Sequence, residues 1–443
     1  MEAQSIAVVG GGIAGLATAW LLGKRHRVTL FEKNAYIGGH THTVDVSTEQ
    51  GPVAVDTGFI VYNEQNYPHL TALLRHLGVT SQPSDMSFSV SIGAGSVEYA
   101  GNSLNTLFAQ RANLISPTYA GMLLDILRFN RSAKRLLSEQ PAEQLTLGDF
   151  LSRGGYSEAF RDYYVLPMAA AIWSCPTGAM LRFPLLSFVR FFANHGLLNL
   201  SRRPMWRTVV GGGRSYVERI LNSGRMSVHR ADPVERVSRD TAGVWVQTAC
   251  GYRDRFDQVV LACHADQALA IIEQPRDGEA RVLGSFHYQA NRAVLHSDIS
   301  LMPVRRRAWA SWNYLASTPE GGAHAVTVTY WLNRLQRLGT RMPLLVTLNP
   351  PSEPASEVVL KRMTYHHPVF DAAAIAAQKL IRHIQGQDRL WFCGSYCGHG
   401  FHEDALRSAL TVARGLGVEA PWLERQVHPI DVHLRHATQA LTP

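Results

Sequence analysis

Residues 5–32, SIAVVGGGIAGLATAWLLGKRHRVTLFE, decide the fold of this protein. The stretch opens with a short apolar run rich in β-branched residues, which predicts a buried parallel strand. A G-x-G-x-x-G turn from Gly10 to Gly15 follows at once, then an apolar helical stretch, and then a second strand that ends at Glu32. A strand, a glycine turn, a helix and a second strand closed by an acidic residue form the pattern of a dinucleotide-binding βαβ unit.

The residue types in this unit each suit a dinucleotide. Gly10 permits a tight turn, Gly12 lets backbone N–H groups approach a pyrophosphate, and Gly15 allows the helix to pack closely on the strand. The N-terminus of the helix adds partial positive charge. Glu32 can accept hydrogen bonds from a ribose diol and disfavours a 2′-phosphate, which argues against NADP and leaves NAD and FAD open. The candidate cofactor-binding residues in this unit are Gly10, Gly12, Ile13, Ala14, Gly15 and Glu32.

The sequence after Glu32 favours FAD. Residues 32–41, EKNAYIGGHT, resemble the E-x-x-x-x-x-G-G-[R/H]-x element of the flavin amine oxidase and phytoene desaturase superfamily. In that group the double glycine carries the chain past the FAD pyrophosphate, and a D-x-G segment, which residues 55–60 (VDTGFI) resemble, runs alongside the flavin. Many members have arginine where this chain has Tyr36 and His40, so the resemblance implies that an imidazole replaces one phosphate contact. The residues that it adds to the candidate FAD site are Lys33, Gly38, Gly39, His40, Thr41, Gly58, Phe59 and Ile60.

The resemblance resumes far downstream, as expected if the cofactor domain is discontinuous. Residues 206–216, WRTVVGGGRSY, look like the family's second glycine turn, and in relatives the strand around Val234 packs near the adenine. Residues 389–402, RLWFCGSYCGHGFH, resemble the family's C-terminal strand, turn and helix start. There the helix N-terminus points at the N1–C2 edge of the flavin, where a helix dipole stabilises the negative charge that reduction creates. These segments add Val234, Gly394, Phe401, His402 and Ala405 to the candidate site.

We therefore predict an α/β fold, with a discontinuous Rossmann-type FAD-binding domain and an α+β substrate domain. Residues 66–203 read mostly as helices and residues 284–364 as strands, which predicts an antiparallel sheet covered by helices. Strands are expected at residues 226–236, 244–248, 257–263, 287–296, 324–332, 344–348 and 357–364. The expected segments are 1–65, 205–280 and 380–420 for the FAD-binding domain, 66–204 and 281–379 for the substrate domain, and 421–443 for a C-terminal tail.

The composition excludes several classes of protein. With 46% hydrophobic and 18% charged residues among 443, the chain is neither disordered nor fibrous. Five cysteines cannot form a disulfide framework and fit a reducing compartment. The N-terminus has no cationic region of a signal peptide, and the apolar stretch 183–200 is broken by polar residues, so it cannot span a bilayer. We expect a cytoplasmic protein, with a peripheral position on the inner face of the membrane left open.

The formal net charge of +8 favours anionic partners. Residues 123–137 form a cationic amphipathic stretch, residues 182–207 mix basic with aromatic side chains, and Arg305, Arg306 and Arg307 precede Trp309. Such stretches suit an anionic membrane surface, although ordinary solvated helix faces fit them equally well. Nucleic acid is not expected as a partner, because no reader motif is present.

Cysteine and histidine gather near the C-terminal turn, at Cys393, Cys397, His399 and His402. We expect no metal there, because the same turn is needed for the flavin and a zinc ion would compete with that role. The chain has no cysteine between Cys263 and Cys393, where relatives with a cysteinyl flavin carry theirs, so we expect non-covalent FAD.

The most specific resemblance is to a bacterial branch of this superfamily, carried by residues 167–174 (PMAAAIWS), 194–198 (NHGLL) and 400–404 (GFHED). That branch is associated with cyclopropane-synthase-like lipid methyltransferases, and some members are linked to desaturating methyl-branched acyl chains. The resemblance implies hydride removal from the acyl chain of a lipid or another hydrophobic small molecule, with a lipid methyltransferase as a partner. The residues expected to place the acyl chain are Tyr62, Trp173, Tyr396 and His402.

Two other functions remain open at this point. An amine oxidase would use Trp331 and Tyr396 as the aromatic walls of its substrate pocket. A non-catalytic partner of a methyltransferase would keep FAD only for stability. Core packing also explains strand aromatics such as Trp331, because half-buried strands favour these residues.

Overall fold

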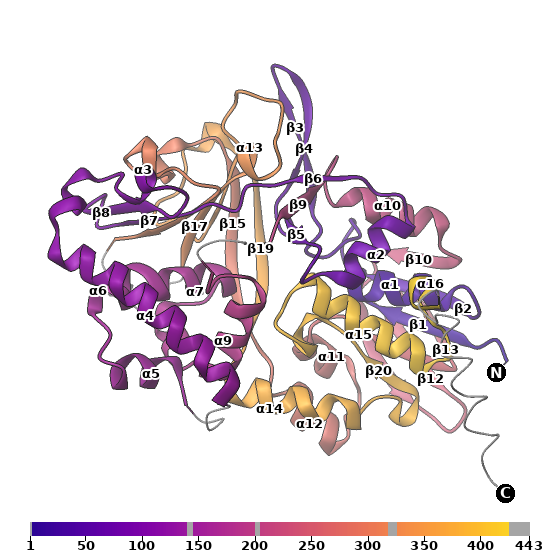
Figure 1. The fold of residues 1–443 in the computed structure, drawn as a ribbon. Helices are drawn as coiled ribbons and strands as arrows, with labels where there is room; N and C mark the ends of the chain where they lie inside the picture. Colours follow the sequence, from indigo (N-terminus) through magenta and orange to yellow (C-terminus); the bar gives the residue numbers. More distant parts are fainter. Residues whose placement is uncertain (1, 140–144, 200–203, 318–325, 425–443) are drawn as a thin grey trace, which may run out of the picture.

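The computed structural model describes residues 2–139, 145–199, 204–317 and 326–424. They build two parts, one around a parallel sheet and one around a larger mixed sheet (Figure 1). The expected start of a strand at His324, the basic residues Arg202 and Arg203, and residues 425–443 of the expected tail lie outside the described residues.

A five-stranded parallel sheet gathers segments from the start, the middle and the end of the chain. Its order is β10-β2-β1-β14-β20. Successive residues of β1 face opposite sides, because Ile6 and Val8 join one apolar core while Ala7 and Val9 join the other. The strands are β1 (Ser5–Val9), β2 (Arg27–Glu32), β10 (Met226–Arg230), β14 (Gln258–Leu261) and β20 (Leu390–Phe392).

Both faces of this sheet are covered, as a parallel sheet requires. Four helices bury their apolar residues in the core on one face: α1 (Ile13–Leu22), α2 (Pro68–His76), α10 (Arg214–Ser223) and α15 (His402–Gly415). On the other face lie α11 (Ala265–Ile271), α12 (Asp277–Leu283), α14 (Ala372–Leu380) and an antiparallel sheet of β11 (Val234–Arg239), β12 (Val244–Thr248) and β13 (Arg253–Phe256).

A seven-stranded sheet forms the second part, in the order β19-β15-β18-β17-β16-β7-β8. The helices α4 (Pro117–Glu139), α7 (Leu166–Trp173) and α9 (Leu185–Asn194) pack into the same apolar core as one face of this sheet. The strands are β7 (Phe88–Ile92), β8 (Val97–Ala100), β15 (His287–His296), β16 (Trp312–Ala316), β17 (Thr327–Trp331), β18 (Leu345–Leu348) and β19 (Val359–Val369).

This sheet corrects two details of the expected substrate domain. The segment 66–203 is not only helical, because β7 and β8 belong to the sheet, and the alternation in FSVSI at residues 88–92 is the local pattern of a strand. The pairing is also not wholly antiparallel, since β7 and β16 run parallel. Parallel neighbours must come from distant segments, so this pairing has no local sequence pattern.

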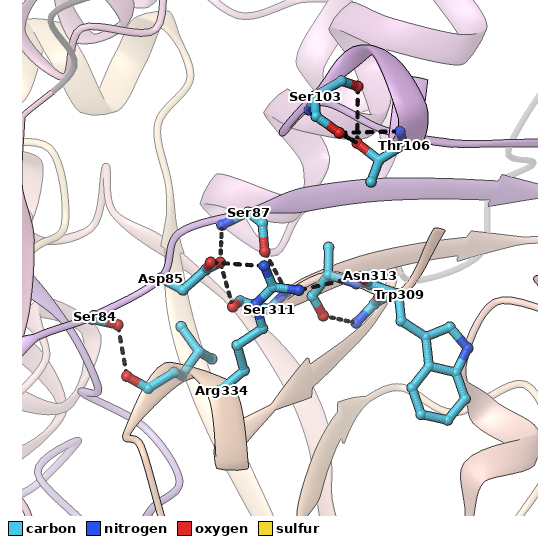
Figure 2. A network of polar contacts seen from close by, with 11 residues as sticks. Ser84, Asp85, Ser87, Ser103, Thr106, Trp309, Ser311, Asn313 and Arg334 are labelled. Atoms are coloured by element: carbon cyan, nitrogen blue, oxygen red, sulfur yellow. Dashed lines mark hydrogen bonds and ion pairs between the residues drawn. The ribbon is translucent and has the colours of Figure 1, made fainter. Parts of the chain in front are cut away.

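A polar network holds β7 beside β16 (Figure 2). Asp85, just before β7, accepts hydrogen bonds from the Ser311 hydroxyl at 2.9 Å and from Arg334 Nη2 at 2.9 Å. The Ser87 hydroxyl in turn accepts a bond from the Ser311 backbone N–H at 2.9 Å. These contacts fix the register of the parallel pair from three separate segments.

The single strand expected at residues 226–236 is two strands in different sheets. β10 ends at Arg230 and β11 begins at Val234. Ala231 between them has a left-handed φ of 55°, and Pro233 has no N–H to donate to a ladder. The chain therefore leaves the parallel sheet at this point.

Within the described part of the stretch 182–207, the phenylalanines do not lie on the surface beside the basic residues. In α9, Phe188, Phe191 and Phe192 are buried in the core, whereas Arg190 is exposed. The helix is amphipathic because it packs on other helices and on the sheet.

A buried carboxylate ties α15 to α2. Glu403 accepts hydrogen bonds from the backbone N–H groups of His69 and Leu70, each at 3.0 Å, in the first turn of α2. These N–H groups have no partner within the helix. We expect Glu403→Ala to lower the free energy of unfolding by about 2–3 kcal/mol, because it leaves two buried donors unpaired. Urea denaturation measures the change; Glu403→Gln, which keeps one acceptor oxygen, should lose less, and an unchanged Ala variant would contradict the capping role.

Candidate cofactor and substrate site

The glycine turn after β1 is tight at two positions and open at the third. A Cβ at Gly10 would lie 2.9 Å from the carbonyl oxygen of Ala262, and a Cβ at Gly15 would lie 1.8 Å from that of Gly10. A Cβ at Gly12 would meet nothing within 4 Å. Gly12 is the residue before α1, and no side chain caps the helix there. The N–H groups of the first turn, at Ile13 and Ala14, therefore have no partner within the helix and lie next to the open space at Gly12.

The second pair of glycines lies against this turn. The Gly38 N–H donates to the carbonyl of Gly11 at 2.9 Å, and Gly39, with a left-handed φ of 59°, is so close that its Cβ would lie 3.0 Å from Gly12 Cα. Residues almost thirty positions apart thus form one backbone cradle. Open space, unpaired N–H groups and a helix N-terminus fit the pyrophosphate of a dinucleotide.

Glu32 closes the cradle at the end of β2. Its side chain is buried and accepts hydrogen bonds from the backbone N–H groups of Gly11 at 2.7 Å and Asn34 at 2.8 Å. The Asp232 N–H donates to the Glu32 carbonyl at 3.2 Å, which places the start of β11, at Val234, beside this end of the sheet. Lys33, next in the chain, is exposed.

The predicted residues around Thr41 and His402 come together across the two halves of the chain. The Thr41 hydroxyl lies 2.9 Å from His402 Nε2, and the His402 ring stacks on Phe59 with centroids 3.7 Å apart. Tyr216, at the end of the second glycine turn, hydrogen-bonds through its hydroxyl to Thr41. Burial, with a smaller effect of His40, lowers the pKa of His402 to about 3, so this ring is neutral.

Gly58 and Ile60 are the chain neighbours of Phe59, whose ring stacks on His402. The Phe59 N–H donates to the His40 carbonyl at 2.7 Å, and a Cβ at Gly58 would lie 2.3 Å from the same oxygen. Ile60 is buried, and its carbonyl accepts a bond from the Thr208 hydroxyl at 2.9 Å. These contacts hold the D-x-G segment against the double glycine.

A group of imidazoles surrounds His40, and the sequence reading did not anticipate it. The His40 ring lies 5.4 Å from His367 and 6.3 Å from His264. Burial, and then neighbouring histidines, lower the pKa of His40 to about 4 and that of His367 to about 3. His264 stacks on Tyr288 at 4.4 Å, and its pKa is also lowered to about 3, mainly by burial. The run YHHP at residues 365–368 was the only sequence pattern that could have indicated this group.

At the other end of the site, α15 begins directly after the turn that follows β20. The Gly394 N–H donates to the Ser408 hydroxyl at 2.9 Å, and the Phe401 N–H donates to Asp404 at 3.1 Å. Ala405 is buried against the parallel sheet's core. The helix start is therefore fixed to the sheet and to the double-glycine segment at once.

The expected substrate residues separate into different places. Trp173 packs on Phe191 at 4.7 Å, and Phe191 stacks on Phe401 at 5.1 Å, so Trp173 connects to the start of α15. Its indole Nε1 is buried without a hydrogen-bond partner. Tyr62 belongs instead to the apolar core beside the parallel sheet, and its hydroxyl lies 2.9 Å from the Ser81 hydroxyl.

Trp331 and Tyr396 do not form a pair of aromatic walls. In β17, Tyr330 faces the helices and Trp331 the opposite side of the sheet, where it packs on Trp309 at 5.6 Å. Tyr396 is 1% exposed and packs on Phe286 in the core behind the parallel sheet. The amine-pocket interpretation of these two residues was wrong, because strand alternation and the turn after β20 send them into different layers.

The cysteine and histidine residues near the C-terminal turn also face different partners. Cys393 lies in the core with its sulfur 3.7 Å from the Thr18 hydroxyl, whereas His402 contacts Thr41. Within the part of the chain that the structure describes, no group of three or more His, Cys, Asp or Glu side chains could hold a metal ion. Over the same residues, no helix combines the length and the apolar character needed to cross a membrane.

Several known proteins share this architecture. A CLA-producing fatty acid isomerase from P. acnes superimposes with a TM-score of 0.67 at 16% identity, covering 92% of this chain and 98% of the isomerase. Cyclohexylamine oxidase from Brevibacterium oxydans IH-35A superimposes with a TM-score of 0.65 at 16% identity, covering 94% and 99%. At such identities the likeness concerns the fold.

Sequence comparison identifies the family. The carotenoid phi-ring synthase of Streptomyces griseus is 28% identical over 279 residues, which are 59% of this chain and 52% of that protein, so the match spans about half the length of this relative. Residues 13–416 match the family described as flavin containing amine oxidoreductase. This range contains the second half of the glycine turn, both halves of the Thr41–His402 contact and the whole seven-stranded sheet. The chain therefore belongs to the flavin-containing amine oxidoreductases, a family of FAD-dependent oxidoreductases, and its cofactor is FAD.

Proposed function

We propose that this enzyme removes a hydride from a carbon atom of a lipid acyl chain and leaves a double bond. When bound, FAD supplies the acceptor for the hydride and its two electrons, and the accompanying proton leaves the neighbouring carbon. The protein has to orient the chain, exclude water and accept this proton. The observation that carries the proposal is an aromatic wall without a free carboxylate at the start of α15.

The aromatic wall suits an apolar substrate. Phe191 stacks on Phe401 and on His195, and Trp173 packs behind it. Phe191 and Trp173 are buried within the same apolar core as the helices over the seven-stranded sheet. Such a wall offers contact area to a methylene chain and no counter-charge.

The carboxylates near the site are already engaged with other groups. Glu32 and Glu403 bind backbone N–H groups, as described above, and Asp404 caps the start of α15. Asp56 accepts hydrogen bonds from the Gly213 N–H at 2.9 Å and Gln336 Nε2 at 3.0 Å. A substrate ammonium group would need an unpaired acid or an aromatic cage, so this arrangement favours a neutral substrate over an amine.

His195 is a candidate for the proton acceptor. Its Nδ1 lies 3.0 Å from the Phe191 carbonyl oxygen, so Nδ1 carries the hydrogen and Nε2 keeps its lone pair. Burial lowers the pKa of His195 to about 4, which keeps the ring neutral before the reaction. Its ring stacks on Phe191 at 3.8 Å, within the wall itself.

Non-covalent attachment of FAD is part of this proposal. Burial raises the pKa of the Cys263, Cys393 and Cys397 thiols to about 12. A protonated thiol is a poor nucleophile, so none of the three is suited to attack a flavin ring. A lipid methyltransferase partner rests on the sequence resemblance alone and stays a prediction.

An anaerobic titration followed near 450 nm tests the function. One arm adds dispersed lipids with unsaturated or methyl-branched chains, and the other adds primary amines and polyamines. We expect lipid to bleach the flavin and amines to leave it oxidised, and the product should be lighter by two hydrogen atoms. Bleaching by amines alone would replace the proposal with amine oxidation. If only dithionite bleached the flavin, a structural role for the cofactor would be favoured. Acid precipitation tests the non-covalent attachment separately, and it should release all of the flavin into the supernatant.

A further inference from the structure

Exposed apolar side chains gather on one side of the larger part. Eleven large hydrophobic side chains are exposed among the described residues, and six of them lie between residues 104 and 127 or at Val304. Ile115 is 87% exposed, Leu104 76% and Val304 72%, and Leu124 and Leu114 follow at 68% and 61%. Ordinary surfaces carry such residues singly, so their concentration requires an explanation.

These residues form one continuous surface. The helix α3 (Leu104–Leu107) packs against the turn Arg306–Ala308, just after Val304, and the turn Arg111–Ile115 packs against the start of α4. Buried Glu98 of β8 accepts a hydrogen bond from the Val304 N–H at 2.7 Å. In Figure 1, α3, β8 and α4 lie along the left edge, away from the parallel sheet.

The surface is held firmly. α3 starts with a capping box in which Ser103 and Thr106 bind each other's backbone N–H groups (Figure 2). The Thr106 hydroxyl also donates to the Ala100 carbonyl at 2.9 Å. Arg111 donates to the Phe108 carbonyl at 2.8 Å, which fixes the next turn to α3. The apolar side chains are therefore presented by ordered backbone.

α4 continues the surface as a stripe. Pro117, Ala120, Leu124 and Arg131 are all exposed and recur every three, four or seven positions, which places them on one face of the helix. The opposite face, with Met122 among its members, is buried in the core.

Basic side chains predominate on this surface, and Asp125 of α4 is paired with Arg128 at 2.8 Å. No acidic residue occurs between residues 104 and 124 or between 299 and 310. Arg111, Arg306 and Arg307 are exposed next to the apolar side chains. Further along α4, Arg131, Lys134 and Arg135 are exposed as well, with Asp125 as the nearest acid on the helix.

We propose that this apolar and basic surface docks the protein on an anionic lipid bilayer. Leu104, Leu114, Ile115 and Val304 would enter the boundary between headgroups and acyl chains, while the arginines contact lipid phosphates. Exposed apolar side chains interspersed with arginines match the acyl chains and the phosphates of a bilayer together, which favours lipid over a protein partner. The inference rests on the proposed function in one respect, since a lipid substrate gives the enzyme a reason to be at the membrane.

Vesicle sedimentation tests the docking surface without turnover. The full-length, flavin-loaded protein is mixed with sucrose-loaded vesicles of phosphatidylcholine, or of phosphatidylcholine and phosphatidylglycerol at 7:3, at low and high salt. We expect binding to the anionic vesicles only and weaker binding at high salt. Leu114→Ser/Ile115→Ser should lower the partition coefficient at least tenfold, and Arg306→Gln roughly fivefold, as expected for one charge near an anionic surface.

The matched control is Leu360→Ser. Leu360 is an exposed apolar residue of β19 and is followed by the basic residues Lys361 and Arg362. It therefore combines the same residue types at a position outside the proposed docking surface. Flavin content and melting temperature should match the parent chain in every variant. Equal binding of all variants, or no binding to either vesicle, would overturn the inference, and so would a Leu114/Ile115 variant that only changes self-association. Because flavin bleaching with dispersed lipid needs no bilayer, either proposal can fail while the other stands.

Discussion

The Gly12→Asp variant is expected to be slightly more stable than the parent apo-protein and to purify without yellow colour. A Cβ at Gly12 would meet no atom within 4 Å, and the backbone there is extended, with φ −73° and ψ 179°, which any residue can adopt. An aspartate before the first turn of α1 would cap free N–H groups and interact favourably with the helix dipole. This would raise the stability of the apo-protein by about 1 kcal/mol.

The same carboxylate should expel the cofactor. It would stand where the glycine cradle opens, and like charges about 4 Å apart near a protein surface repel strongly enough to weaken FAD binding roughly a thousandfold. Flavin absorbance per polypeptide and the melting temperature of the apo-protein measure the two effects. A Gly12→Asp protein with one flavin per chain would contradict the assigned pyrophosphate position.

Two further variants distinguish the effect of added side-chain volume from the effect of added charge. Gly12→Ala adds volume without charge and should retain part of the flavin. Gly15→Ala should fail to accumulate as folded protein, because its Cβ would lie 1.8 Å from the Gly10 carbonyl oxygen. If Gly15→Ala were soluble and yellow, the close helix–strand contact would be wrong.

The sequence predicted the cofactor cradle well because its physics is local. The turn from Gly10 to Gly15, the acid Glu32 and the double glycine each need particular residue types at short spacing, and the structure places them together. The seven-stranded sheet depends on partners far apart in the chain. The parallel pairing of β7 with β16 has its anchors in residues more than two hundred positions apart, such as Asp85 and Ser311.

The direction of individual side chains was the least predictable feature. Trp331 and Tyr330 are neighbours in one strand, yet they face opposite sides of the sheet, and only tertiary packing decides which of them meets the helices. His264 and His367 meet His40 from two other segments of the chain, at separations that no periodicity reports. The residue types along the sequence were sufficient to predict the cofactor, but they were not sufficient to predict which side chains form the walls of the substrate site.

Acid should unfold this protein between about pH 6 and pH 5, with release of its flavin. His40, His264, His367 and His402 have pKa values lowered to about 4, 3, 3 and 3, chiefly by burial. Each is neutral in the folded protein and regains its ordinary pKa near 6.5 on unfolding. Their contribution to stability is therefore complete above pH 6.5 and is lost as the pH falls towards 4 for His40 and towards 3 for the other three.

The magnitude is large because the four groups act together. Each one reduces the free energy of unfolding by up to about 1.4 kcal/mol per pH unit below 6.5, or about 2 kcal/mol at pH 5. Asp56 acts in the opposite direction, because burial raises its pKa to about 7 and its stabilising effect is gained as the pH falls from 7 towards 4. The remaining loss from these five groups, about 5 kcal/mol at pH 5, is comparable with the whole stability of many domains.

Denaturant titrations from pH 7.5 to 5 measure this loss, and flavin fluorescence reports release of the cofactor. The slope of the unfolding free energy against pH should correspond to at least three protons taken up on unfolding, because other imidazoles such as His195, with a pKa lowered to about 4, add to the four named here. His367→Asn should reduce that slope by about one proton, since it removes one buried imidazole and keeps a side chain that can bond to Asn291, which lies 2.9 Å from His367 Nδ1. His287→Asn, at an exposed position of β15, is the matched control and should leave the slope unchanged. A slope below one proton in the parent chain would mean that the imidazoles around His40 stay hydrated, and the closed arrangement of the cofactor site would then be wrong.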